Sequence, residues 1–297
     1  MKIIITGSLG HISKPLTQEL VQKGHAVTVI SSSPDKQAAI EALGAKAAIG
    51  SIEDVDFLTA TFTGADAVYT MIPPGNFADP NFDVMAHCRQ LADNYAQAIE
   101  ASGVKRVIHL SSIGAHLKKG SGIILFHHQV EGVLNRLADV DITFMRPVGF
   151  YYNMFGFIPQ IKNQGFISAN YGADENLVWV SPIDIAAAIV KELETAPTHR
   201  KVTYVASDEL TGHETARILG EAIGKPDLKW VLVSDEERQQ LLEAVGLSQK
   251  IAAGLVEMFA SQRSGLLMED YYRHKPELGK VKTADFAKEF TAVYNQN

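Results

Sequence analysis

The sequence has little cysteine, no excess of positive charge and no long hydrophobic run. Cys88 is the only cysteine in 297 residues, which excludes an intrachain disulfide and favours a reducing compartment. The 27 basic residues are outnumbered by 34 acidic ones, and the net charge of −7 argues against direct binding of nucleic acid. The apolar run from Ile3 to Ile5 is too short for a signal peptide, and no run is long enough to span a bilayer. We therefore expect a cytoplasmic protein that binds a small molecule and no membrane.

Short β-branched segments alternate with helical patterns through the first half of the chain. Strands are predicted over residues 2–6, 26–30, 46–49, 67–72, 107–111 and 142–146, and helices over 12–22, 35–43, 54–62, 81–101 and 122–137. This alternation is typical of βαβ units and a parallel sheet. The strands before residue 112 are nearly continuous apolar runs, so we expect helices on both faces of the sheet.

The second half of the chain is less regular. After Arg146 comes a stretch rich in aromatic residues and glycine. Thr211 and Ser234 each precede a glutamate by three residues, the spacing of a capping box, and therefore predict two helix starts. Residues 202–205 are expected to return to the sheet, so this half forms a smaller lobe with some segments in the main sheet.

The segment GSLGHIS, residues 7–13, links the first predicted strand to the first helix. A helix N-terminus presents unpaired N–H groups and a positive dipole end, so a tight turn with little side-chain bulk can hold an anion. Gly7 permits the turn and Gly10 lets a pyrophosphate approach the backbone, while Ser13 replaces the usual third glycine and should loosen the packing of helix on strand. A plain turn is the alternative, but the position in a βαβ series favours a dinucleotide site.

The end of the second strand indicates which dinucleotide binds. NAD sites usually carry an acidic side chain there for the ribose. This chain has Ser31, Ser32 and Ser33, and the first carboxylate is Asp35. Because serine hydroxyls and backbone amides can bind a 2′-phosphate, NADP is favoured over NAD; the alternative is that Ser33 merely begins a turn.

Five segments together resemble one known family: TGSLGHIS, VYTMIPP, VIHLSSIGAH, HHQVEGVL and TFMRPVGFYYN. They are similar to the NmrA-like family of atypical short-chain dehydrogenases/reductases, and the resemblance extends over nearly the whole chain. It implies an α/β fold, with a Rossmann-type doubly wound parallel sheet and a smaller C-terminal α/β lobe. The NAD(P)-binding domain would cover residues 1–150, and the substrate or effector lobe mainly 151–297. Members include NADP-sensing regulators and quinone reductases.

The resemblance also implies which residues bind each part of the cofactor. Gly7, Ser8, Gly10, His11 and Ile12 would contact the pyrophosphate, and Ser32 and Ser33 the adenosine ribose. Met71, Ile72 and Pro73 would line the path beyond the fourth strand, Ser111 and Ser112 would lie beside the nicotinamide ribose, and Pro147 and Val148 would approach the ring.

The acid–base pair of ordinary short-chain dehydrogenases is absent. Those enzymes are similar to one another in having a Tyr-x-x-x-Lys pair, in which the tyrosine transfers the proton that accompanies hydride transfer and the lysine lowers the pKa of the tyrosine. In similar sequences of these enzymes the lysine lies four residues before a helix glutamate, and the resemblance matches this glutamate to Glu131. It therefore puts His127 at the lysine position and Ile123 at the tyrosine position. With a pKa near neutrality, His127 suits a proton donor or a contact to the nicotinamide ribose, and a helix-face histidine without a role is the alternative. Neighbouring His128 points about 100° away on a helix, so no metal site is predicted.

Tyr151, Tyr152 and Asn153 follow the sixth strand at its carboxyl end, where open α/β sheets bind ligands. We predict that at least one of them lines the substrate cleft; the alternative is packing within the lobe. His116 is interpreted as a solvated loop residue, and Tyr271 as a packing residue that can border the cleft.

Two functions from different classes fit this pattern. The first is an NADPH-dependent reductase of quinones or similar small acceptors, because a reduced quinone is a stabilised anion that needs no strong proton donor. The second is a non-catalytic NADP(H) redox sensor that acts through a regulatory protein partner. A sugar-nucleotide epimerase is disfavoured. Its reaction is similar to a hydride shuttle, and such a shuttle depends on the Tyr and Lys that are missing here. The sequence leaves open whether the protein forms a homo-oligomer.

Overall fold

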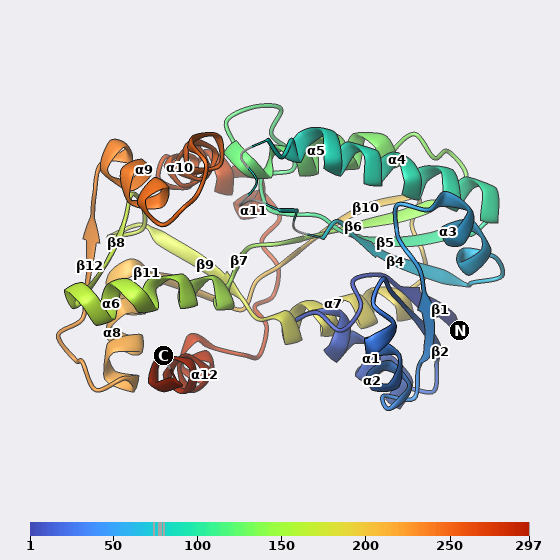
Figure 1. Ribbon diagram of the computed structural model, residues 1–297, viewed down its shortest axis with the longest axis horizontal. Coiled ribbons are helices and arrows are strands. Elements are labelled where there is room, and N and C mark those ends of the chain that lie inside the picture. Colours follow the sequence, from blue (N-terminus) through green and yellow to red (C-terminus); the bar gives the residue numbers. More distant parts are fainter. Residues whose placement is uncertain (74, 77–78, 80, 297) are drawn as a thin grey trace.

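A seven-stranded parallel sheet forms the centre of the larger part of the molecule, shown in a computed structural model that describes residues 1–73, 75–76, 79 and 81–296 (Figure 1). Its strand order is β10-β6-β5-β4-β1-β2-β3. The strands are β1 (Lys2–Ile5), β2 (Ala26–Ser31), β3 (Lys46–Ile49), β4 (Ala67–Met71), β5 (Arg106–Leu110), β6 (Asp141–Pro147) and β10 (Arg200–Val205). The order reverses between β1 and β4, the switch point at which such sheets bind ligands. The predicted Rossmann-type sheet is confirmed.

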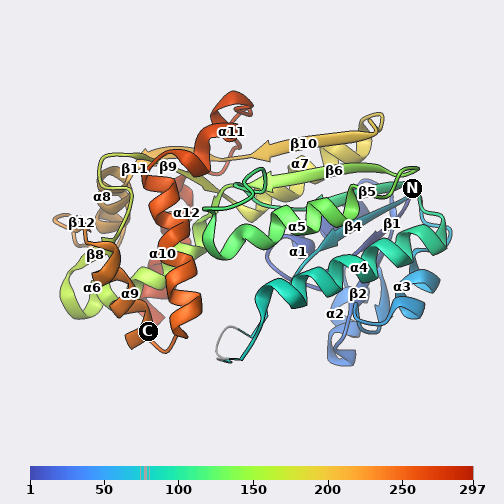
Figure 2. The ribbon, with the colours of Figure 1, turned by 90° about the horizontal axis from the view of Figure 1, so that it is seen from above.

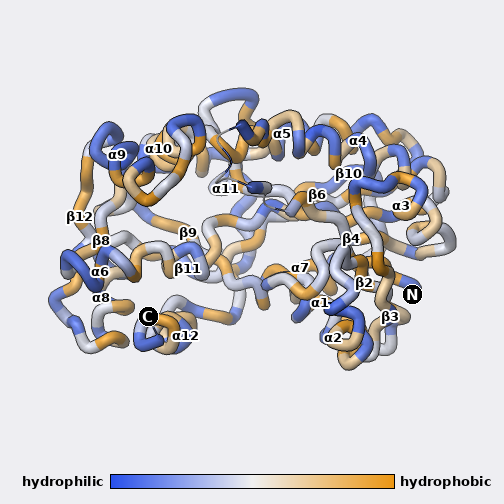
Figure 3. The backbone as a smooth tube through the Cα atoms, in the orientation of Figure 1, coloured by the Kyte–Doolittle hydropathy of each residue, from blue (hydrophilic) through white to orange (hydrophobic). Residues whose placement is uncertain are grey.

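Helices cover both faces of this sheet (Figures 1 and 2). One face carries α1 (Ser13–Gln22), α2 (Gln37–Glu41) and α7 (Pro182–Glu194), and the other carries α3 (Val55–Phe62), α4 (Val84–Ser102) and α5 (Leu125–Leu134). Along β1, Ile3 and Ile5 enter the core beneath α1 and α7, while Ile4 enters the core beneath α4 and α5. Both sides of the strand are therefore apolar, and hydrophobic and hydrophilic stretches alternate along α4 and α5 (Figure 3).

The remaining elements form the smaller lobe, on the left in Figure 1. Its strands are β7 (Gly149–Phe150), β8 (Phe166–Ala169), β9 (Asn176–Val180), β11 (Asp208–Thr211) and β12 (Lys229–Leu232). Its helices are α6 (Ile158–Gln164), α8 (Gly212–Ala222), α9 (Asp235–Ala244), α10 (Gln249–Arg263) and α12 (Thr283–Gln296), and α11 (Glu269–Arg273) packs back on the sheet domain. Short 3₁₀ helices lie at η1 (Pro34–Lys36), η2 (Gly122–Ile124), η3 (Tyr151–Phe157) and η4 (Leu266–Met268). Both predicted capping boxes are present, Thr211 with Glu214 and Ser234 with Glu237.

Two glycines bring the backbones of the sheet domain and the lobe into direct contact. Gly122, in η2, has a φ of +54°, and a Cβ on it would overlap the Gly254 carbonyl oxygen of α10. A side chain at residue 122 would therefore push α10 away from the sheet domain. Among the described residues, no helix combines the length and the hydrophobicity that crossing a bilayer requires.

Candidate cofactor site and cleft

The glycine loop turns sharply between β1 and α1. Gly7 has a φ of +88°, and a Cβ on it would lie 2.8 Å from Ser13 Oγ and 3.2 Å from the Met71 side chain. A Cβ on Gly10 would meet only the Gly7 carbonyl oxygen, at 3.2 Å, among the described residues beyond its chain neighbours. The turn thus requires glycine at residue 7, and residue 10 approaches the backbone of residue 7 so closely that glycine is favoured there as well.

The side chain of Ser13 is buried and makes a hydrogen bond within the turn. Its buried Oγ donates to the Thr6 carbonyl oxygen at 2.9 Å, and Thr6 Oγ1 in turn accepts from the Met71 amide at 3.0 Å. A serine at the third position can therefore replace the close glycine contact with a hydrogen bond between α1 and the end of β1.

The N-terminus of α1 has no side-chain cap and no acidic residue in its first turn. Helices α3, α4 and α7 differ, because Asp54, Asp83 and Ser181 accept hydrogen bonds from their first-turn amides. Within this turn the Lys14 amide donates to the Gly10 carbonyl oxygen at 3.0 Å and Pro15 has no N–H, which leaves the Ser13 amide without an acceptor among the described residues. An anion beside the turn is a suitable acceptor for this amide.

A pocket of about 320 Å³ opens beside this loop, at the carboxyl ends of β1, β2, β3 and β4. Its lining residues are Gly7, Ser8, Ile30, Ser31, Ser32, Gly50, Ser51, Ile52, Glu53, Met71, Pro73, His87 and Leu91. Five of these belong to the cofactor residues expected from the sequence. Sequence reasoning missed Gly50–Glu53 and His87, although parallel strands end at one edge and the end of the third strand belongs there as much as the second.

The serines at the end of β2 are held in order. Ser31 Oγ accepts from Ser8 Oγ at 3.1 Å and from the Ser33 amide at 3.2 Å, while Ser32 is exposed at the pocket. Ser33, Ile72, His11 and Ile12 do not line this pocket, and Ile72 and Ile12 are buried. Glu53 brings a carboxylate into the lining from the loop after β3.

At the end of β5, where the nicotinamide is expected, Ser111 belongs to a buried ionic network. Its Oγ donates to Glu131 Oε1 at 2.6 Å, and Glu131 forms a two-pronged pair with Arg146, with Nε–Oε1 and Nη2–Oε2 distances of 2.9 and 2.7 Å. Arg146 Nη1 also donates to Asp270 Oδ2 at 3.1 Å, and the Tyr204 hydroxyl donates to the same oxygen at 2.6 Å. Burial opposes the charge of Arg146, but its bonds to Glu131 and Tyr204 raise its pKa.

Pro147 and Val148 are buried directly after this arginine, and Ser112 is half-buried. The Ile113 amide donates to the Pro147 carbonyl oxygen at 2.9 Å, which joins the loop after β5 to the end of β6. The residues expected near the nicotinamide therefore lie on two adjacent strand ends.

His127 does not have the near-neutral pKa on which its expected role as a proton donor relied. Burial lowers its pKa to about 3, with His109 and Arg146 adding repulsion, and its Nδ1 has no hydrogen-bond partner among the described residues. The side chain is therefore neutral at physiological pH, which leaves a hydrogen bond to a ribose as the simpler role. His128 has a different function: its Nδ1 donates to the Ala115 carbonyl oxygen at 2.9 Å.

The three residues predicted to line the substrate cleft point in different directions. Tyr151 is buried in the lobe core, where it stacks on Phe286 and its hydroxyl donates to the Val281 carbonyl oxygen at 3.1 Å. This is the packing role that the sequence left open. Asn153 is exposed, whereas the Tyr152 ring stacks on His11 of the glycine loop, with ring centroids 4.5 Å apart. Of the three, Tyr152 is therefore the one that contacts the glycine loop.

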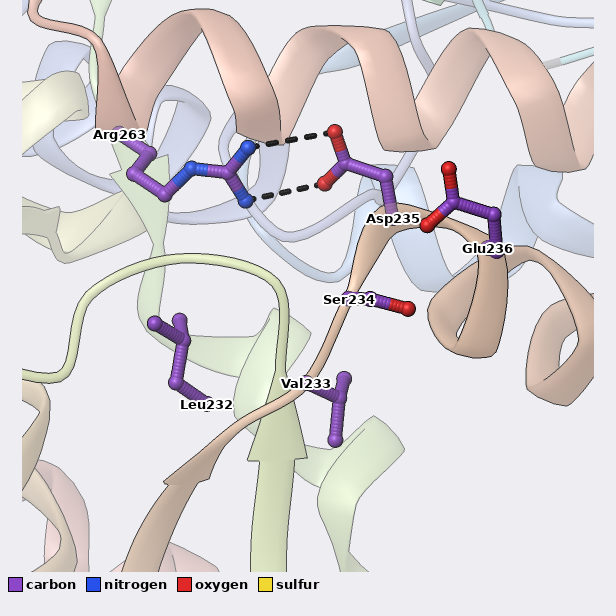
Figure 4. Close-up of a pocket in the computed structure, with 6 residues that line it drawn as sticks. All are labelled: Leu232, Val233, Ser234, Asp235, Glu236 and Arg263. Atoms are coloured by element: carbon purple, nitrogen blue, oxygen red, sulfur yellow. Dashed lines mark hydrogen bonds and ion pairs between the residues drawn. The ribbon is translucent and has the colours of Figure 1, made fainter.

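A second hollow, of about 480 Å³, lies on the lobe, and its lining residues are shown in Figure 4. It is lined by residues 232–236 and Arg263. Arg263 forms two bonds to the Asp235 carboxylate, at 2.9 and 3.2 Å, so the facing charges neutralise each other. Nothing in this hollow matches the predicted cofactor chemistry.

Comparison with known proteins shows the family to which the chain belongs. A family model described as NAD(P)H-binding matches residues 7–196. The chain belongs to this NAD(P)H-binding family. Family membership confirms the predicted NAD(P) binding and the resemblance to NmrA-like atypical short-chain dehydrogenases/reductases.

Similar proteins of the NAD(P)H-binding family and fold include reductases. The (4-alkanoyl-5-oxo-2,5-dihydrofuran-3-yl)methyl phosphate reductase of Streptomyces griseus subsp. griseus is 25% identical over 226 residues, 75% of this chain and 74% of the relative. An NADPH-dependent quinone oxidoreductase from Escherichia coli, solved with NADPH, has a TM-score of 0.75 at 19% identity, covering 97% of this chain and 99% of that chain. A nucleoside-diphosphate-sugar epimerase from Staphylococcus aureus has a TM-score of 0.79 at 17% identity, covering 97% and 100%. The two structures establish the fold, and the named reductases agree with the predicted NAD(P)H-dependent oxidoreductase.

Proposed function

We propose that this protein is an NADPH-dependent reductase of small planar acceptors, and that quinones are the first class to test. The observation that carries the proposal is the pairing of an uncapped α1 and its glycine turn with Ile123 and His127 at the usual Tyr and Lys positions. When bound, the reduced nicotinamide supplies a hydride. An acceptor whose reduced form is a stabilised anion needs no strong acid, so the absent pair is no obstacle to such a reaction.

The residues of the chain have separate tasks in this proposal. The Ser13 amide and the positive end of the α1 dipole hold the diphosphate, and the neutral His127 and Ser111 bind the nicotinamide ribose. Glu131 and Arg146 hold Ser111 in position. The buried ion pair gives the Glu131 carboxylate a single orientation, and this carboxylate accepts the Ser111 hydroxyl. The Tyr152 ring, from the lobe, stacks on His11 and so covers one side of the glycine loop.

NADPH is proposed over NADH because Ser31, Ser32 and Ser33 offer hydroxyls and amides, without a carboxylate, at the end of β2. The quinone oxidoreductase of the same fold was solved with NADPH, which agrees with this choice. Substitution of Ser32 by Asp should lower the affinity for NADPH by about 1–3 kcal/mol through repulsion of the 2′-phosphate and spare NADH. Fluorescence titration with both cofactors measures this difference.

Turnover is tested by mixing the protein, NADPH and a panel of benzoquinones and naphthoquinones and following loss of nicotinamide absorbance. Gly10→Asp is the matched negative control, because its carboxylate would enter the diphosphate position. The reductase proposal fails if no acceptor accelerates NADPH oxidation above the Gly10→Asp background.

A redox sensor is the second candidate, favoured by the neutral state of His127 and the missing Tyr and Lys. A sensor would bind NADP(H) tightly, discriminate strongly between oxidised and reduced cofactor, and show no turnover with any acceptor. The titration and the turnover assay together therefore separate the two functions.

A further inference from the structure

A carboxylate enters the candidate cofactor pocket from the strand next to the one that carries the serines. Strands β2 and β3 are parallel, with Ser31 opposite Ile49, and the Gly50 amide donates to the Ser31 carbonyl oxygen at 3.0 Å. The segments that follow these two strands therefore begin side by side, at the spacing of neighbouring strands, about 4.8 Å. Ser32 comes from one segment and Glu53 from the other, and both line the pocket of about 320 Å³.

The backbone of Glu53 is held from two sides. Its amide donates to Ser51 Oγ at 3.1 Å, and its carbonyl oxygen accepts from Asn94 Nδ2 of α4, also at 3.1 Å. Asn94 is buried, and its Oδ1 accepts from Gln90 Nε2 at 2.9 Å, which fixes the orientation of the amide. The Glu53 side chain therefore starts from a fixed point at the pocket.

The Glu53 carboxylate is not neutralised by its surroundings. In the part of the chain that the structure describes it has no hydrogen bond or ion pair, whereas the next carboxylate, Asp54, caps α3 and accepts from the Phe57 amide at 3.0 Å. The described lining of the pocket contains no lysine or arginine, and His87 is its only other titratable side chain. An unpaired negative charge therefore lies at the pocket.

A carboxylate and a cation have opposite effects on the choice between NAD and NADP. In NAD sites an acidic side chain binds the 2′-hydroxyl of the adenosine ribose, and in NADP sites an arginine accommodates the 2′-phosphate. The described lining has the acid, on the neighbouring strand end, and lacks the arginine. The serines at the end of β2 suit a phosphate, so the two strand ends favour different cofactors.

We propose that Glu53 is a specificity-determining residue that accepts the ribose 2′-hydroxyl of NADH, repels the 2′-phosphate of NADPH and so keeps the preference for NADPH small. This inference rests on the cofactor site of the proposed function. It gives the end of β3 the role that an acid at the end of β2 has in ordinary NAD sites. Because Glu53 is exposed, its effect is that of a surface charge, and the two Kd values of the wild type should lie within about tenfold of each other.

Fluorescence titration with NADPH and NADH tests the proposal in the wild type, Glu53→Gln and Glu53→Lys. Glu53→Gln keeps the size of the side chain, and it should lower the Kd for NADPH by about twofold to tenfold without lowering the Kd for NADH. Glu53→Lys should lower the Kd for NADPH further, because it places a cation where the carboxylate was.

Asp56→Asn is the matched control. It removes the same charge from the exposed first turn of α3, outside the described lining of the pocket, and it should leave the ratio of the two Kd values unchanged.

Salt separates an effect of charge from an effect of shape. The Debye length falls from about 10 Å at 0.1 M to about 3 Å at 1 M ionic strength, so the gain in NADPH affinity of Glu53→Gln over the wild type should shrink at 1 M salt. A ratio of Kd values that neither Glu53 variant changes would overturn this inference alone, as would a gain that persists in full at 1 M salt or a larger wild-type preference for NADPH. A wild type that binds neither cofactor would overturn the proposed function itself.

Discussion

Replacement of Arg146 by Met should destabilise the protein far more than the loss of an ordinary ion pair. The side chains of Arg146 and Glu131 are each only 8% exposed, and Glu131 has no other cationic partner in the described network. The variant would bury an unpaired carboxylate, which costs about 3–5 kcal/mol. At about 2–4 °C per kcal/mol for a chain somewhat smaller than this one, the melting temperature should fall by roughly 5–15 °C.

Urea unfolding with thermal melts measures both quantities, and two further variants make the reasoning refutable. Glu131→Leu combined with Arg146→Met removes both charges and should regain most of the stability, because apolar side chains often replace buried ion pairs without loss. Arg273→Met breaks the exposed pair with Glu269 and should change nothing measurable. The reasoning fails if Arg146→Met costs less than about 1 kcal/mol, or if the double variant is as unstable as the single one.

Three further predictions address acid stability, the cleft and the lobe. Burial lowers the pKa of His109 from 6.5 to about 3. Between pH 3 and pH 6.5 only the unfolded chain therefore carries a proton on this imidazole. The free energy of unfolding should fall by about 1.4 kcal/mol for each pH unit below 6.5. In urea titrations over this range His109→Gln should flatten the slope by one proton, and an unchanged slope would contradict the assignment. Tyr152→Leu removes the ring stacked on His11 and should weaken NADPH binding by about 1 kcal/mol in a fluorescence titration, whereas Tyr152→Phe should not. Ser234→Ala removes the cap of α9 and should cost about 1 kcal/mol in urea unfolding with no change in NADPH affinity, and an altered affinity would count against separate roles for lobe and cofactor site.

The sheet domain was predictable because its local signals agree with its tertiary structure. The strand over 46–49 has the predicted bounds, and the other predicted strands differ by one or two residues. Both faces of these strands are buried, so continuous apolar runs mark them clearly. Helix α7 was not predicted, although Ser181 caps its first turn and Pro182 begins it, which are typical signals of a helix start.

The chemistry around the cleft was less predictable, because it depends on contacts between distant parts of the chain. Ser111 and Glu131 were singled out separately, but nothing local indicates that Arg146 and Asp270 complete one network with them. The pKa of His127 likewise depends on burial by elements remote in sequence. The residue type alone predicts the ordinary pKa of a histidine, and burial within the fold lowers that pKa.

The contact between Gly122 and Gly254 gives the molecule an adjustable spacing that no cleft residue controls. An alanine at residue 122 would act as a wedge between η2 and α10 and tilt the lobe outward, while every group that touches a ligand stayed chemically the same. The distance between η2 and α10 therefore depends on the absence of a side chain at residue 122.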